Sequence, residues 1–208
     1  MNLTIRKAFV LLSRCALPLA LLLPVAGFAD GPASLKKGPE KTLSLQTATF
    51  AAGCFWGTEE FFRKVPGVVE TRVGFTGGHT PHPSYEDTGD GHTGHAESVE
   101  IRFDPSRVTY DKLLDLFFKM HDPTTLNRQG NDQGTQYRSA IFAHGEDQRR
   151  AADAFKAKVE KSGAWKRPIV TQISLATDFW PAEEYHQKYL LKHPHGYDNH
   201  FLRALSFD

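Results

Sequence analysis

The sequence predicts an α+β domain, a two-layer sandwich in which helices pack on a mixed or antiparallel sheet. Some segments alternate apolar and polar residues, which is typical of half-buried strands, and others repeat apolar residues every three or four positions, which is typical of amphipathic helices. The order of these segments is β-α-β-β-α-β-α-β-α, and short hairpin-like turns are mixed with crossover connections.

The first two strands flank a helix that follows a sharp bend. Small and apolar residues at 47–52 predict a strand, and Gly53 lets the backbone turn into a helix over residues 55–65. Apolar side chains of that helix recur at spacings of three, four and seven until Pro66-Gly67 ends it. Residues 69–75 alternate apolar and polar and are expected to form the second strand.

Two irregular segments interrupt the remaining elements. Residues 76–95 are rich in glycine, proline and histidine, and residues 122–136 are also irregular. Long segments of this kind are usually functional or mobile, so we expect the first to wall a site. Further strands are expected at 97–103, 137–143 and 169–176, and further helices at 110–121, where Thr109 can cap the start, 146–161 and 183–192.

The composition and length of the chain are typical of a globular protein with one domain, or at most two small ones. The chain has 208 residues, of which 40% are hydrophobic and 24% charged. Residues 1–29 differ, because they carry cations, no acidic residue, an apolar run too short to span a bilayer comfortably, and small residues at Gly27 and Ala29. This pattern predicts a secretory signal peptide cleaved before Asp30, with an uncleaved membrane anchor as the alternative.

Export would leave a flexible lead-in at 30–46 and a single domain at 47–208, located in the periplasm or secreted. Removal of three cations and no anion with the signal changes the formal charge from +1 to −2. Neither a nucleic acid nor an anionic membrane is therefore expected as a partner of the mature chain. Signal removal also discards Cys15, so Cys54 would be the only cysteine and no internal disulfide can form.

Cys54 is the first candidate for a reactive group. It lies at the expected helix start, where free backbone N–H groups and the helix dipole favour a thiolate. The alternative is a small buried hydrophobic residue. Glu97 lies where the long irregular segment meets an apolar strand, so burial would raise its pKa and suit it to general acid catalysis. The alternative is a solvated glutamate at a strand end.

Further candidates lie in or beside the irregular segments. Tyr85 and Tyr137 could donate hydrogen bonds to a substrate oxygen, although either could simply pack. Asp132 lies between glycines among many polar residues, where an ordinary Asx turn is equally consistent with the sequence. Phe55 and Trp56 would form an aromatic pocket beside the thiol or join the core.

The histidines are candidates for metal ligands or for catalytic bases. Their short-spaced pairs lack the neighbouring cysteines or carboxylates and the helical i, i+4 spacing of defined zinc motifs, so no metal site is expected. His95 or His186 could activate Cys54 in a cysteine hydrolase, but no local signature supports that class. A thiol peroxidase and an exported histidine-based metal binder also remain as alternatives.

Several motifs together resemble the A-type peptide-methionine sulfoxide reductases, in order and across nearly the whole expected domain. They are Gly53-Cys54-Phe55-Trp56-Gly57, residues 77–85, Gly94-His95-Ala96-Glu97, His121-Asp122-Pro123-Thr124, residues 130–139 and residues 182–190. The resemblance implies a ferredoxin-like core and reduction of methionine (S)-sulfoxide, free or in proteins, without a bound cofactor.

The resemblance also implies residue roles. Cys54 would attack the sulfoxide sulfur while Glu97 protonates the oxygen, with hydrogen bonds from Tyr85 and Tyr137. Asp132 would help to order the site or would bind the substrate backbone. Phe55 and Trp56 would receive the methyl group, and Gly53 and His95 would contribute to substrate binding.

The expected recycling of the enzyme departs from many relatives. Residues 196–208 contain no cysteine, whereas many members of that family resolve the sulfenic acid of the nucleophile with further cysteines. We therefore expect the sulfenic acid to be reduced by an external thiol, either a small thiol or a thioredoxin-like protein. The protein is expected to be a monomer.

Overall fold

The computed structural model describes residues 44–208. The expected signal peptide at 1–29, and the lead-in apart from its last three residues, lie outside the described residues. Within residues 44–208, no helix is both long and apolar enough to cross a membrane.

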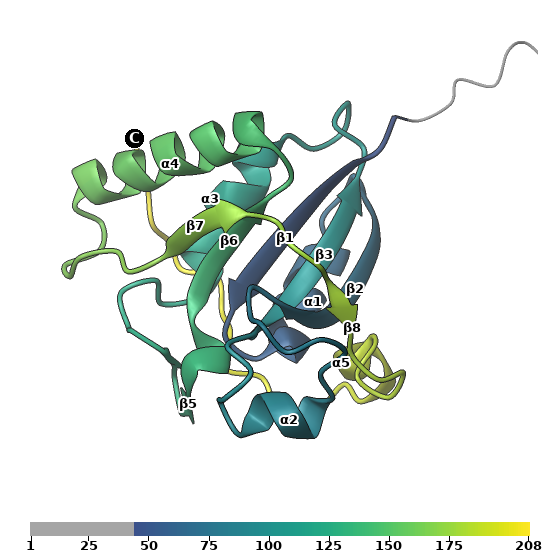
Figure 1. Ribbon diagram of the computed structural model, residues 1–208. Helices are drawn as coiled ribbons and strands as arrows, with labels where there is room; N and C mark the ends of the chain where they lie inside the picture. The colour runs from purple at the N-terminus through teal and green to yellow at the C-terminus, as the bar shows by residue number, and fades with distance from the viewer. Residues whose placement is uncertain (1–43) are drawn as a thin grey trace, which may run out of the picture. The chain divides into compact units, whose positions relative to one another are not determined.

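Six strands form one mixed sheet in the order β7-β6-β1-β3-β2-β8 (Figure 1). Neighbouring strands are antiparallel except for β6 and β7, which are parallel. The strands are β1 (Gln46–Ala52), β2 (Val68–Thr76), β3 (Ala96–Phe103), β6 (Ser139–Ala143), β7 (Gln172–Leu175) and β8 (Trp180–Pro181). This confirms the predicted α+β class with helices packed on a mixed sheet.

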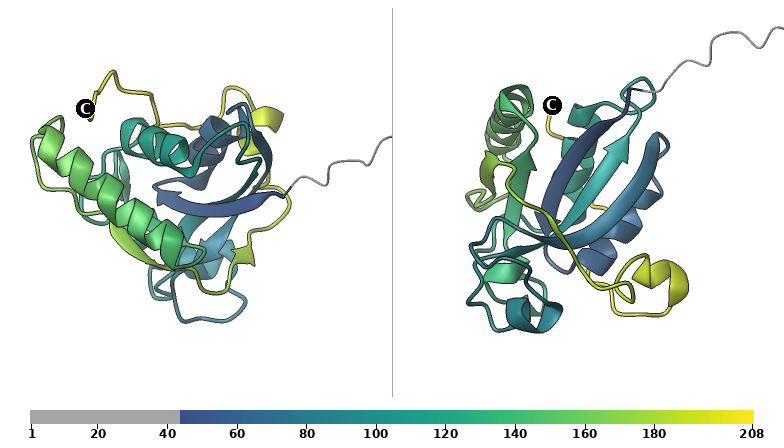
Figure 2. Two further views of the ribbon diagram at one scale, coloured as in Figure 1. Left: turned by 90° about the horizontal axis from the view of Figure 1, so that it is seen from above. Right: turned by 45° about the vertical axis from the view of Figure 1, so that its right-hand side comes forward.

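The four strands in the order β6-β1-β3-β2 form a ferredoxin-like core. Helix α1 (Phe55–Arg63) connects β1 to β2, and α3 (Tyr110–Met120) connects β3 to β6. Both helices lie behind the sheet in Figure 1, whereas the chain between β7 and β8 crosses in front of it. Helix α4 (Glu146–Ser162) packs beside α3, and the C-terminus returns to it (Figure 2).

Strand alternation divides the apolar side chains of β1 between two faces. The Phe50 ring is fully buried and stacks on Phe62 of α1 and Phe117 of α3, with ring centroids 5.2 Å apart in both pairs. Ala51 points to the other face, where it belongs to a small buried cluster with Ala96, Ala140 and Phe142. One aromatic side chain therefore joins the sheet to both crossover helices.

The irregular segments contain short elements that the sequence pattern did not predict. Helix α2 (Tyr85–Gly89) is capped by Ser84, which forms a capping box with Asp87. The second segment contains the hairpin β4 (Arg128–Gln129) and β5 (Asp132–Gln133), followed by the 3-10 helix η1 (Thr135–Tyr137). Tyr137 therefore ends a helical turn rather than beginning β6.

The predicted helix at 183–192 is wrong over most of its length, because only α5 (Tyr189–Lys192) is helical. Lys188 has φ +55°, which interrupts a right-handed helix. Gln187 instead bonds the backbone of Val73, and Lys188 bonds Glu59. These contacts with distant parts of the chain override the local helical periodicity.

Substitution Phe50→Ala should lower the free energy of unfolding by about 3–5 kcal/mol, because it leaves a cavity at the contact of three elements. Urea denaturation followed by circular dichroism measures this change. Phe201→Ala is a matched control, since Phe201 is 58% exposed, and it should cost less than about 1 kcal/mol. Equal losses for the two variants would contradict this account of the core.

Candidate active site

Cys54 is placed by the tight turn between β1 and α1. Gly53 has φ +93°, and a Cβ there would lie 2.5 Å from the Cβ of Gln129, so this position requires glycine. Cys54 itself is the N-cap residue of α1 and is 8% exposed. Its carbonyl accepts bonds from both the amide and the hydroxyl of Thr58, at 3.3 and 3.1 Å. The turn thus presents a largely buried thiol at a helix start.

Glu97 lies beside this turn although it is far away in sequence. The Phe55 amide, one residue after Cys54, donates a hydrogen bond of 3.0 Å to the Oε2 atom of Glu97. The Glu97 side chain is 2% exposed, and burial raises its pKa to about 8 despite that bond. The desolvation expected from the sequence is confirmed, and most Glu97 carboxyls hold a proton at neutral pH.

The expected thiolate at Cys54 is wrong for the resting protein. Burial raises the pKa of the thiol well above its usual value, and a negative charge on Glu97, when it is ionised, raises it further. The amides of Trp56 and Gly57 act in the opposite direction but do not compensate. Desolvation therefore outweighs the helix terminus, and Cys54 rests as a thiol.

Two phenols approach the same pair of groups. Burial is the main cause that raises the pKa of Tyr85 to about 12, and negative charge on Glu97 or Cys54, when either is ionised, acts in the same direction. Burial also raises the pKa of Tyr137, and the charges of Glu97 and Cys54 act on it as well. The structure therefore brings all four groups within electrostatic reach, and both phenols remain protonated hydrogen-bond donors.

Aromatic rings form one wall of the site. The Trp56 indole donates a hydrogen bond of 2.9 Å to Nδ1 of His186 and stacks on Tyr189, with a centroid distance of 3.8 Å. His186 also lies against Tyr85 at 4.3 Å. Phe55 is 1% exposed and stacks on Tyr85 at 6.2 Å, so it belongs to both the core and the wall.

Asp132 is held by the C-terminal segment. It accepts hydrogen bonds from the Tyr197 hydroxyl at 3.1 Å and from Asn199 at 2.9 Å. Its charge contributes to the raised pKa of both Cys54 and Glu97, so Asp132 lies near these two residues.

His95 is not brought into this group. Its Nδ1 accepts from the Gly78 amide at 3.1 Å, and its Nε2 lies 2.8 Å from the Thr80 carbonyl, so the loop backbone occupies both ring nitrogens. This ring therefore has no free nitrogen for a substrate or for Cys54. In the described part of the chain, no three histidine, cysteine, aspartate or glutamate side chains form a group that could hold a metal ion.

Sequence reasoning missed the C-terminal contribution and the wall partners of Trp56. Asn199, Tyr197 and Tyr189 were not candidates, and His186 was considered only as a base. The motif at residues 182–190, which forms part of the family resemblance, contains both His186 and Tyr189 and could have indicated their place in the site. Nothing local pairs residues 197–199 with Asp132.

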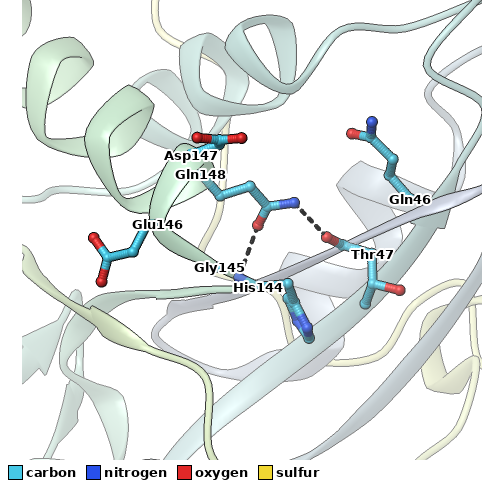
Figure 3. Close-up of a pocket in the computed structure, with 7 residues that line it drawn as sticks. All are labelled: Gln46, Thr47, His144, Gly145, Glu146, Asp147 and Gln148. Atoms are coloured by element: carbon cyan, nitrogen blue, oxygen red, sulfur yellow. Dashed lines mark hydrogen bonds between the residues drawn. The ribbon is translucent and has the colours of Figure 1, made fainter.

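A cavity of about 530 Å³ lies elsewhere, at the start of β1 and the N-terminus of α4 (Figure 3). There the Gln148 amide accepts from the His144 backbone and donates to the Thr47 carbonyl, which ties α4 to β1. The length of β1 separates this end from the turn at Cys54 by about 20 Å. The cavity is therefore not part of the group around Cys54.

Comparison with known proteins identifies the family of this chain. The family model described as peptide methionine sulfoxide reductase matches residues 46–205. A relative named peptide methionine sulfoxide reductase MsrA, from Methanothermobacter thermautotrophicus, is 59% identical over 149 residues, which are 72% of this chain and 88% of the relative.

Solved structures agree with the sequence comparison. Reduced Mxr1 from Saccharomyces cerevisiae has a TM-score of 0.72 and 40% identity, covering 76% of this chain and 92% of the yeast chain. Yeast Mxr1 in complex with Trx2 has a TM-score of 0.53 and 28% identity, covering 81% of this chain and 96% of the other. The chain therefore belongs to the peptide methionine sulfoxide reductase family, and its relatives make it an A-type member.

Proposed function

We propose that Cys54 is the nucleophile with which this peptide-methionine (S)-S-oxide reductase reduces methionine sulfoxide. The observation that carries this assignment is the bond between the Phe55 amide and Glu97, which holds a protonated carboxyl beside the thiol. A sulfoxide oxygen leaves poorly as an anion, so proton donation to it lowers the barrier. Glu97 is the general acid in this scheme.

The reaction balances within these groups. Sγ of Cys54 attacks the sulfoxide sulfur, and Glu97 protonates the oxygen. The attack forms a bond between Sγ and the substrate sulfur. This bond and the sulfur–oxygen bond then break, methionine leaves, and the oxygen passes to Cys54 as the hydroxyl of a sulfenic acid. The thiol proton returns to Glu97, the substrate sulfur is reduced by two electrons, and the cysteine sulfur is oxidised by two.

The surrounding residues supply binding and charge stabilisation. Tyr85 and Tyr137 keep their protons because their pKa values are raised, so both can donate to the sulfoxide oxygen as charge develops. Phe55 and Trp56 receive the methyl group against their rings. Asp132, held by the C-terminal segment, orders the site.

Recycling requires a thiol from outside the protein. Cys54 is the only cysteine among residues 44–208, so no second thiol of that region can resolve the sulfenic acid. An external thiol attacks the sulfenic sulfur and releases water, and a second thiol reduces the mixed disulfide. A thioredoxin-like protein suits this role, because the yeast relative forms a complex with Trx2. A small thiol is the alternative.

We also propose that the protein is exported and monomeric. Residues 1–29 direct export to the periplasm or beyond the cell, and the mature protein acts as a monomer on free or protein-bound substrate. N-terminal sequencing of the exported protein should begin at Asp30, and light scattering should give the mass of one chain. A thiol peroxidase is not favoured, because the matching family is that of the peptide methionine sulfoxide reductases.

With Cys15 replaced by serine, incubation with methionine (S)-sulfoxide and no reductant should yield one methionine per chain and a sulfenic acid on Cys54. Dimedone labelling followed by mass spectrometry detects that acid. Cys54→Ser should yield no methionine. Substrate reduction by the wild-type residue without a dimedone adduct would rule out the scheme.

The single-turnover kcat/KM should fall as pH rises through about 8, because the proton that Glu97 donates is then lost. Glu97→Gln should lower kcat/KM by about 100-fold and remove this fall. Glu100→Gln is a matched control on the same strand and should keep the wild-type profile. A fall near pH 8 that persists in Glu97→Gln would assign the proton to another group.

A further inference from the structure

The segment that supplies the aromatic wall also contains an acidic side chain with no role so far. Glu183 lies three residues before His186, and its Oε1 atom accepts a hydrogen bond of 3.0 Å from the Tyr85 amide. Tyr85 is the first residue of α2 and one of the two phenols beside Cys54. The Glu183 carboxylate therefore holds the backbone of Tyr85, which is far away in sequence.

The second oxygen of Glu183 faces the wall. Its Oε2 atom lies 4.0 Å from Nε2 of His186, and both atoms are buried without a hydrogen-bond partner. An indole N–H can only donate, so Nδ1 of His186 accepts from Trp56 and the neutral ring carries its proton on Nε2. A donor and an acceptor thus face each other just beyond hydrogen-bond reach.

The rest of the segment is attached independently of Glu183. The Gln187 amide accepts from the Val73 amide and donates to its carbonyl, both at 2.9 Å. Lys188 donates to the buried Glu59 carboxylate from its amide at 2.7 Å and from Nζ at 2.8 Å. Removing the Glu183 carboxylate should therefore leave the wall attached and disturb chiefly the start of α2.

We propose that Glu183 is a positioning residue for Tyr85, whose phenol it aligns with the sulfoxide oxygen by holding the first turn of α2 against the ring of His186. This inference rests on the proposed function of Tyr85. The bond to the backbone fixes the Cα position of Tyr85, and the 4.3 Å contact with His186 fixes its ring. Small displacements of such groups have large kinetic costs.

Glu183→Ala should lower the single-turnover kcat about tenfold with little change in KM, since the phenol acts mainly in the transition state. In a Tyr85→Phe background the same change should cost less than about twofold, because the group that Glu183 positions is already gone. Glu183→Gln keeps an oxygen for the Tyr85 amide and should retain at least about a third of the wild-type kcat.

Glu184→Ala is the matched control, because the Glu184 carboxylate is on the adjacent residue and its side chain is 89% exposed. It should leave kcat and KM unchanged. Activity of Glu183→Ala equal to wild type, or an equal loss with and without the Tyr85 hydroxyl, would overturn the proposal. A Gln variant as impaired as the Ala variant would also overturn it.

Hydrogen exchange of the Tyr85 amide tests the same link without using activity. Exchange should be slow in the wild type and in Glu183→Gln, and faster in Glu183→Ala. If the wild type failed to reduce methionine sulfoxide, the proposed function would fail while this measurement still judged the contact. Unchanged exchange in Glu183→Ala would remove the physical basis of the positioning role.

Discussion

The bond between the Phe55 amide and the Glu97 carboxyl is the interaction on which the rest of the site depends. A buried carboxyl is costly to ionise, and so is a buried thiol beside it. Burial raises the pKa of both groups, so the pair rests with both protons in place. In the proposed scheme, substrate meets a carboxyl that already holds the proton for its oxygen and a thiol that must still lose its own.

The fold supports this pair from two directions. Strand β1 and helix α1 meet at the turn that carries Cys54, and β3 brings Glu97 to the same point through its antiparallel contacts with β1 and β2. The Phe50 ring joins that sheet to both crossover helices. The position of the thiol relative to the acid is thus set by sheet register and core packing, which are stiffer than loop contacts.

Local patterns predicted the parts of the site that local structure determines. Gly53 indicated the turn before Cys54, and the strand boundary at Glu97 indicated a buried carboxyl. The predicted direction of the Cys54 pKa shift was wrong. The helix start, which lowers the pKa, is visible in the sequence, whereas burial, which raises it, is a property of the whole fold. Lys188 shows the same limit, since its left-handed backbone reflects bonds to Glu59, which is far away in the chain.

The C-terminal segment connects the structure to recycling. Asn199 and Tyr197 bond Asp132, and His200 contacts the Ala52 carbonyl at 2.7 Å, so the segment is tied to the turn that presents Cys54. Gly57 leaves the space that Asp198 and His200 occupy, because a Cβ there would clash with both.

A chain that resolves its sulfenic acid with a C-terminal cysteine must bring that residue to the nucleophile. Here the corresponding stretch is instead bonded to the base of the site, and it contains no thiol. The contacts that hold Asp132 near Cys54 therefore favour a fixed C-terminal segment over one that moves to the nucleophile. Reduction by a thiol from outside is the chemistry that such a fixed site requires.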